Sequence, residues 1–122
     1  MSNSILIVDD NALVRNLLRA WIEEHSGWVV CGEAENGKQA IEKVAELTPN
    51  VVLLDFQMPI MNGLDAARQI RLLAPETGMV MFTMHSSPQL LQQARAAGIR
   101  DVVSKSDLLS EHLLSALKQI CA

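Results

Sequence analysis

The sequence has no cluster of basic residues, and this absence limits the classes of partner that the chain can bind. Ten Lys and Arg residues stand against 14 Asp and Glu residues in a chain of 122, giving a formal net charge of -4. Direct binding to nucleic acid normally needs a basic face that neutralises phosphates. We therefore expect this chain to make no direct contact with nucleic acid.

Long apolar runs and paired cysteines are also missing. The most strand-like run, Val51 to Leu54, is far shorter than the roughly 20 residues that span a bilayer. The N-terminus enters a strand-like run at Ile5 without a charged region before a long apolar core, unlike a signal peptide. Cys31 and Cys121 lie far apart and lack metal-ligand spacing. We expect a cytoplasmic location, free thiols and no membrane partner.

What the sequence does contain is a regular alternation of short apolar runs with segments of helical period. Its hydrophobic content of 49% and charged content of 20% are those of a folded domain, and 122 residues can close one hydrophobic core. Five βα units predict an α/β fold with a parallel sheet covered on both faces, in one domain over residues 1–122. We expect strands at 5–8, 29–34, 51–54, 79–83 and 102–103, each followed by a helix.

Local signals mark several helix boundaries. Gly98 predicts the end of the fourth helix, and Ser110 lies near the start of the last one. The first helix is expected to bury one stripe of six apolar residues: Leu13, Val14, Leu17, Leu18, Trp21 and Ile22. The capping signals are Asn36 with Gln39, Asn62 with Asp65, and Ser87 followed by Pro88.

Polar residues capable of chemistry stand where the predicted strands end. Asp9 and Asp10 follow the first strand, Asp55 the third, Thr83 ends the fourth, and Lys105 follows the fifth. Ligands of open parallel sheets bind beyond the carboxyl ends of the strands, so we expect these side chains to meet. Three carboxylates so close repel one another unless a cation joins them, and Mg²⁺ prefers carboxylates, waters and phosphate oxygens.

A cation-bound carboxylate beside a lysine is an arrangement suited to phosphoryl transfer. Asp55 is the expected nucleophile, because a carboxylate can become an aspartyl-phosphate and this one follows the most buried strand. Lys105 is expected to pair with the phosphoryl group, and the Thr83 hydroxyl to donate to it.

Taken together, these motifs resemble the receiver domains of two-component response regulators. The resemblance is carried by Asp9-Asp10, by the stretch from Asp55 to Gly63, and by Thr83 and Lys105, and it covers essentially the whole chain. It implies a doubly wound, flavodoxin-like fold with five parallel strands in the order 2-1-3-4-5 and five helices. It also implies a phosphoprotein of a phosphorelay, whose acceptor Asp55 takes its phosphoryl group from a phosphohistidine of a sensor histidine kinase or a phosphotransfer protein.

The resemblance further assigns roles at the metal and on the output surface. Asp10 and Asp55 match the carboxylate ligands of Mg²⁺, Asp9 matches the acid that reaches the ion through water, and Gln57 matches the residue that lends its backbone carbonyl. The output face corresponds to residues 87–121, the fourth helix, fifth strand and fifth helix, which in the family often forms a homodimer on phosphorylation. Its expected exposed apolar side chains are Leu90, Leu108 and Leu109.

Several positions depart from the family pattern. Val102 stands three residues before the lysine, where a Tyr or Phe ring often reports phosphorylation. Met84 follows the switch threonine, where a small residue is usual, and is expected to crowd the phosphate site. Ser106 replaces the proline often found after the lysine, so no cis peptide is expected there. His85 is interpreted as a passive residue at the rim of the site.

Four alternatives remain open at this stage. Asp10 alone could be a simple helix cap. A phosphatase or phosphotransferase would usually carry a second acid two residues after the nucleophile, where this chain has Gln57; we expect no enzyme beyond assistance to its own phosphorylation and dephosphorylation. A pseudo-receiver would keep the fold without being phosphorylated. Finally, the chain could act alone or be the receiver part of a longer DNA-binding regulator.

Overall fold

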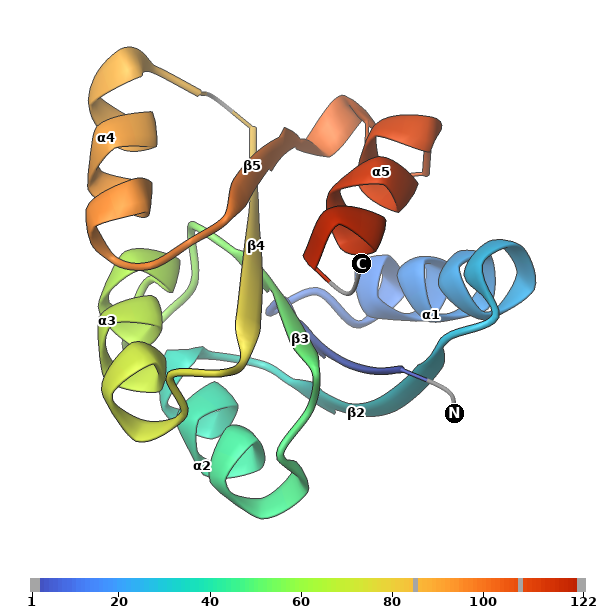
Figure 1. The fold of residues 1–122 in the computed structure, drawn as a ribbon, viewed down its shortest axis with the longest axis horizontal. Helices are drawn as coiled ribbons and strands as arrows, with labels where there is room; N and C mark the ends of the chain where they lie inside the picture. Colours follow the sequence, from blue (N-terminus) through green and yellow to red (C-terminus); the bar gives the residue numbers. More distant parts are fainter. Residues whose placement is uncertain (1–2, 85, 108, 121–122) are drawn as a thin grey trace.

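The computed structural model describes residues 3–84, 86–107 and 109–120, in which strands and helices alternate along the chain (Figure 1). The strands are β1 (Ser4–Val8), β2 (Val29–Ala34), β3 (Val51–Asp55), β4 (Gly78–Thr83) and β5 (Asp101–Ser104). The helices are α1 (Ala12–Ser26), α2 (Gly37–Leu47), α3 (Gly63–Leu73), α4 (Pro88–Ala96) and α5 (Glu111–Ile120), with a short 3-10 helix η1 (Lys105–Asp107) before α5.

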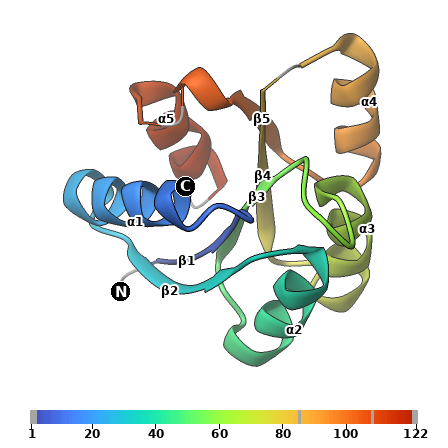
Figure 2. The same cartoon turned by 180° about the vertical axis from the view of Figure 1, so that it is seen from behind.

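The strands form one parallel sheet in the order β2-β1-β3-β4-β5. Helices α1 and α5 cover one face of this sheet, and α2, α3 and α4 cover the other (Figures 1 and 2). The predicted doubly wound, flavodoxin-like order 2-1-3-4-5 is therefore confirmed. Because the strands are parallel, their carboxyl ends share one edge of the sheet.

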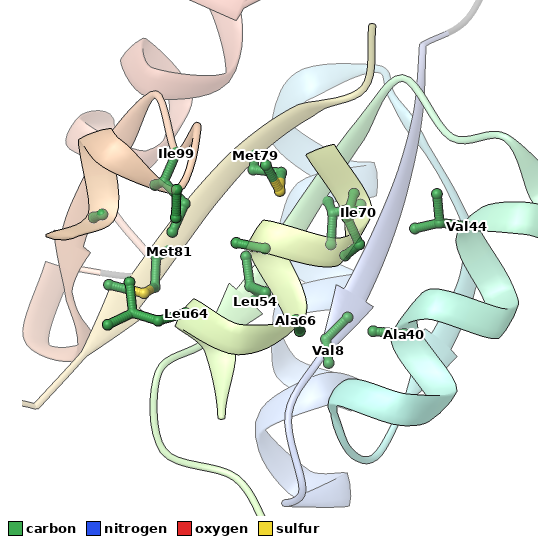
Figure 3. Packing of buried hydrophobic residues seen from close by; sticks show 14 of the residues in the cluster. Val8, Ala40, Val44, Leu54, Leu64, Ala66, Ile70, Met79, Met81 and Ile99 are labelled. Atoms are coloured by element: carbon green, nitrogen blue, oxygen red, sulfur yellow. The ribbon is translucent and has the colours of Figure 1, made fainter. Parts of the chain in front are cut away.

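Each face of the sheet packs against its helices through a separate apolar cluster. Figure 3 shows the cluster under α2, α3 and α4, in which Val8, Leu54 and Met81 of the sheet meet Ala40 and Ile70 of the helices. The second cluster joins the opposite face to α1 and α5. All residues of β3 and β4 are buried, because both faces of these central strands are covered. The ends of these two strands are consequently rigid supports for side chains.

The first helix departs from the expectation in one respect. Leu18 and Ile22 are buried, but Leu13 is 65% exposed and Leu17 is 51% exposed. The predicted stripe of six residues spans about half of the helix circumference at 100° per residue, which is wider than the face that touches the sheet. The side chains on one flank of the stripe therefore remain in solvent.

The predicted caps are confirmed for three helices. The side chain of Asn36 accepts a hydrogen bond from Gln39 N at 2.8 Å, although the Gln39 side chain accepts from Glu35 N rather than from Asn36 N. The other two caps are Asn62, which accepts from Asp65 N at 2.9 Å, and Ser87, which accepts from Leu90 N at 3.1 Å. Gly98, with φ of 92°, follows α4 as expected.

The output face differs from the expectation at one leucine. Leu90 is only 6% exposed, so its predicted exposure is wrong: it packs into the cluster under α4. Leu109 is 47% exposed as expected, and Leu91 is 41% exposed. His85, Leu108 and Cys121, for which predictions were made, lie outside the described residues. In the part of the chain that the structure describes, no helix combines the length and apolar character needed to cross a membrane.

Candidate functional site

Three carboxylates meet at the carboxyl edge of the sheet, as the sequence predicts. Asp9 and Asp10 follow β1, Asp55 ends β3, and one carboxylate oxygen from each lies within 4.8 Å of the other two. Asp9 is fully buried and Asp55 is 2% exposed, whereas Asp10 is exposed. The cluster therefore has a buried floor of two acids and one acid at its mouth.

Lys105 reaches both buried carboxylates. Its ammonium lies 3.1 Å from Asp55 Oδ2 and 3.7 Å from Asp9 Oδ2. The same ammonium lies 5.6 Å from the centre of the Phe82 ring. With its side chain 23% exposed, Lys105 is the cation that partly balances the acidic floor.

The turn between β1 and α1 is organised by its own hydrogen bonds. Asp9 Oδ1 accepts from Asn11 N at 2.8 Å, and Asn11 Oδ1 in turn accepts from Leu13 N and Val14 N. Asn11 is therefore the cap of α1, so the alternative that Asp10 is merely this helix cap is wrong. The Asp10 side chain is left at the mouth of the acidic cluster.

The loop after β3 holds the backbone around Asp55. Phe56 N donates to Phe82 O at 2.9 Å, and Gly63 N donates to Phe56 O at 2.8 Å. A Cβ on Gly63 would clash with the backbone carbonyl oxygen of Asp55, so only glycine fits at the start of α3. Gln57 N donates to Asp55 Oδ1 at 3.3 Å, which fixes the direction of the carboxylate.

Strand register brings Thr83 and Lys105 to the same edge. Thr83 is 3% exposed and pairs with Ser104, the residue before Lys105. Met84 is 62% exposed, so most of its side chain lies in solvent. Val102 is partly buried and packs against the cluster of Figure 3. No peptide bond of the described residues is cis, which agrees with Ser106 after the lysine.

Burial dominates the electrostatics of the two inner acids. It raises the pKa of Asp9 to about 6; the Asn11 amide opposes this shift and the charge of Asp55 adds to it. Burial also raises the pKa of Asp55, against the opposing hydrogen bond and charge of Lys105. Both acids are thus harder to ionise than a carboxyl group in water.

The donor set fits a hard divalent cation. Asp9 Oδ2 is buried and accepts no hydrogen bond from the described residues, with the Lys105 ammonium 3.7 Å away; the other ligand atoms of its cluster are also carboxylate oxygens. Such a buried orphan acceptor is costly, and a cation that prefers oxygen would remove the cost. Among the residues that the structure describes, this cluster consists of Asp9, Asp10 and Asp55 and contains no His or Cys, the ligands that zinc prefers.

A groove of about 310 Å³ borders Lys105 on the side of α1. It is lined by Val14, Leu17, Leu18, Lys105, Ser106 and Leu109. Arg15 is a neighbour that the sequence interpretation missed: its guanidinium donates to the backbone carbonyl of Asp9 at 2.7 Å. Arg15 lies outside the apolar stripe predicted for the first helix, so only its position six residues after Asp9 pointed to this contact.

Comparisons with known proteins agree with this geometry. The sequence profile of the response regulator receiver domain matches residues 5–118. The chain is 37% identical over 105 residues to the chemotaxis protein CheY of Thermotoga maritima, covering 86% of this chain and 87% of that protein. It is 36% identical over 115 residues to the transcriptional regulatory protein YdfI of Bacillus subtilis, covering 94% of this chain but only 53% of that protein.

Solved structures show the same fold. The response regulator domain of Thermotoga maritima CheB superposes with a TM-score of 0.90 at 27% identity, covering 100% of this chain and 98% of that one. A LuxR-family response regulator from Aurantimonas gives a TM-score of 0.91 at 30% identity, covering 99% of this chain and 86% of that one. The chain therefore belongs to the response regulator receiver domains, the phosphorelay signalling domains of two-component systems.

Proposed function

We propose that Asp55 is the phosphoryl acceptor of this receiver domain and that residues 1–122 form a single unit built around it. The observation that carries the proposal is the surroundings of one carboxylate. Asp55 ends the buried strand β3, has the Lys105 ammonium at 3.1 Å, and has oxygens of Asp9 and Asp10 within 4.8 Å. A buried acid beside a fixed cation and further acidic ligands is the arrangement that aspartyl phosphorylation needs.

The transfer itself requires an in-line attack by the carboxylate. An Asp55 oxygen forms a bond to phosphorus while the bond from phosphorus to the donor nitrogen breaks, and the electron pair of that bond stays on the donor imidazole. Gln57 N holds one carboxylate oxygen in position. Lys105 balances the charge of the phosphoryl oxygens, and Thr83, at the end of β4, donates its hydroxyl to the phosphorylated product.

We assign Mg²⁺ to the acidic cluster. Asp10 and Asp55 would be the direct carboxylate ligands, Asp9 the acid that acts through water, and Gln57 the donor of a backbone carbonyl. Bound Mg²⁺ would neutralise the clustered carboxylates and the oxygens of the transferring phosphoryl group. The Oδ2 oxygen of Asp9 supports this assignment, because it is buried and accepts no hydrogen bond from the residues that the structure describes.

The donor is proposed to be a phosphohistidine of a sensor histidine kinase or a phosphotransfer protein, in the cytoplasm. The exposed Asp10, whose carboxylate lies in the same cluster as that of Asp55, supports access by a macromolecular donor. The domain is proposed to catalyse no reaction beyond its own phosphorylation and dephosphorylation. Gln57, two residues after the acceptor, cannot supply the acid that a phosphatase would use to protonate its leaving group.

The signal is proposed to leave through α4, β5 and α5; Leu91 of α4 is exposed there, and Leu109 is exposed in the turn before α5. The aliphatic Val102 cannot act as a moving aromatic ring, so the readout is assigned to the packing of β5 against α4. Homodimer formation through this face on phosphorylation is part of the proposal. Sedimentation before and after phosphorylation would detect it.

Chemical trapping tests the acceptor directly. The domain is incubated with acetyl phosphate and Mg²⁺, and the acyl phosphate is then reduced with borohydride, which converts a phosphorylated aspartate to homoserine. Peptide mapping is expected to find homoserine at position 55. Homoserine at position 10 instead, or at no position, would contradict the assignment.

A pseudo-receiver, which would keep the fold without being phosphorylated, is not favoured by the complete set of Asp9, Asp10, Asp55 and Lys105.

A further inference from the structure

Two arginines of α1 share one carboxylate of β2. Arg15 Nε lies 2.8 Å from Glu33 Oε1, and Arg19 Nε lies 2.9 Å from Glu33 Oε2. Burial alone would raise the pKa of Glu33, but the hydrogen bonds from Arg15 and Arg19 outweigh burial and lower it. Glu33 is therefore charged at neutral pH and holds both guanidinium groups in fixed positions.

The second contact of each arginine separates their roles. Arg15 Nη1 donates to the backbone carbonyl of Asp9 at 2.7 Å, and its side chain is only 12% exposed. Arg19 Nη1 donates to the carbonyl of Val30 at 3.3 Å, near the start of β2, and its side chain is 37% exposed. Of the two arginines, Arg15 is the one that connects the ion pair to the acidic cluster.

The carbonyl that Arg15 holds belongs to the peptide unit between Asp9 and Asp10. Because a peptide unit is planar, fixing its oxygen fixes the orientation of the whole unit and of the Cα atom of Asp10. The same turn is held by Asp9 N, which donates to Ala34 O at 3.1 Å, and by Asn11 N, which donates to Asp9 Oδ1 at 2.8 Å. Among these contacts, that of Arg15 is the one made by a side chain from beyond the turn.

We infer that Arg15, clamped by Glu33, is a positioning residue that holds Asp9 and Asp10 in the geometry in which they bind a divalent cation. The inference rests on the proposed function, since it concerns the same site. Arg15 touches neither the phosphoryl group nor the cation; it acts through the backbone of the acids that do. Outer partners of metal ligands typically change metal affinity by about 10–100-fold when they are removed.

Isothermal titration with Mg²⁺ tests this role, with Arg19→Met as the matched control. Both Arg15→Met and Arg19→Met remove one guanidinium from Glu33, so both are expected to lower the melting temperature, Arg15→Met more because its side chain is more buried. Arg15→Met is expected to weaken Mg²⁺ binding about tenfold, and Arg19→Met less than about twofold. Equal changes in the two variants, or no change in Arg15→Met, would overturn the inference.

Two further variants separate geometry from charge and guard against loss of folding. Arg15→Lys keeps the charge but loses the planar fork that bonds Glu33 and Asp9 together, so its Mg²⁺ affinity should stay close to that of Arg15→Met. If Arg15→Lys bound Mg²⁺ as tightly as wild type, the positive charge at position 15 alone would be enough, and the positioning role of the guanidinium would be overturned. Should Arg15→Met not fold, Glu33→Gln releases the clamp more gently and is expected to weaken Mg²⁺ binding about threefold; an unchanged affinity would contradict the role.

The binding measurement also separates this inference from the proposed function. A wild-type domain that binds Mg²⁺ but gains no phosphoryl group on Asp55 would overturn the proposed function and leave the comparison of Arg15→Met with Arg19→Met intact. A wild-type domain that binds no Mg²⁺ would overturn the role of Arg15 itself.

Discussion

The ammonium of Lys105 lies 3.1 Å from Asp55 Oδ2, although 50 residues separate the two in the chain. The contact follows from the sheet order, which places β3, β4 and β5 side by side with their carboxyl ends at one edge. The same ammonium is 3.7 Å from Asp9 Oδ2. One lysine thus serves as counter-ion to two buried acids.

Removing this lysine is expected to destabilise the domain in the absence of metal. Lys105→Met leaves Asp9 and Asp55 buried without their cation, and we expect the free energy of unfolding to fall by about 1–3 kcal/mol at pH 7. Urea denaturation in EDTA measures this change. The exposed Lys38 offers a matched control, since Lys38→Met should change stability by less than about 0.5 kcal/mol. Equal stability of Lys105→Met and wild type would show that Lys105 does not offset the cost of burying Asp9 and Asp55.

The buried Asp9 predicts an unusual dependence of stability on pH. Its pKa of about 6 in the folded domain lies above the ordinary value of 3.8, so between about pH 4 and pH 6 the folded state binds more protons than the unfolded state. The contribution of Asp9 to the stability of the fold therefore falls as pH rises through this window. At pH 7 the domain bears the full cost of burying the ionised Asp9 carboxylate.

Asp9→Asn removes this titration and tests the sign. In metal-free buffer, the stability of Asp9→Asn relative to wild type should increase from pH 4 to pH 7 by roughly 2–3 kcal/mol. Denaturant melts at the two pH values measure it. A relative stability that is flat or decreases with pH would mean that Asp9 is not a high-pKa group. Addition of Mg²⁺ should reverse the order at pH 7, because the cation stabilises the ionised wild-type site.

The backbone approach at Gly63 predicts a coupling between the start of α3 and the acceptor. The Cβ atom added by Gly63→Ala would press against the carbonyl oxygen of Asp55 and would lie 3.0 Å from Phe56 Cα. We therefore expect the free energy of unfolding to fall by about 1–3 kcal/mol and phosphorylation to be slower. Gly27→Ala is the control: Gly27 has φ of 74° and no atom within 4 Å of a built Cβ. It should cost about 1–2 kcal/mol without altering the rate of phosphorylation. Unchanged phosphorylation in Gly63→Ala would contradict the coupling.

Met84 is expected to have little influence on phosphoryl transfer. Its side chain is 62% exposed, and the acceptor carboxylate is bounded instead by Asp9, Gln57 and Lys105. Met84→Ala should change the rate of labelling by acetyl phosphate less than about twofold, as followed by intact-protein mass. An acceleration of tenfold or more would show that the methionine does crowd the site in the reacting state.

The sequence was sufficient to predict the architecture because its hydrophobic pattern and its capping residues mark the same elements. Short apolar runs and capping residues such as Asn36 and Asn62 locate the elements, and the right-handed crossover of βα units leaves few ways to join them. The convergence of Asp9, Asp55 and Lys105 followed from the rule that parallel strands end at one edge. These features depend on local pattern and topology, which a sequence carries directly.

Contacts that depend on side-chain direction could not be predicted in the same way. The apolar stripe of α1 did not reveal that Leu13 and Leu17 lie outside the contact with the sheet, since the width of that contact depends on how the helix packs. Leu90 and Leu91 are equally apolar neighbours, and only the rotation of α4 decides which is buried. The bond from Arg15 to the Asp9 carbonyl likewise depends on the direction of a side chain, and Arg15 also bonds Glu33 on β2, a residue 18 positions away.

The central claim is that Asp55 accepts a phosphoryl group with the help of a divalent cation held by its neighbours. The most direct measurement is intact-protein mass after incubation with acetyl phosphate, for wild type and Asp55→Asn, each with Mg²⁺ and with EDTA. The account predicts one added phosphoryl group only in wild type with Mg²⁺. Full labelling of Asp55→Asn, or labelling of wild type that is equally fast in EDTA, would contradict it.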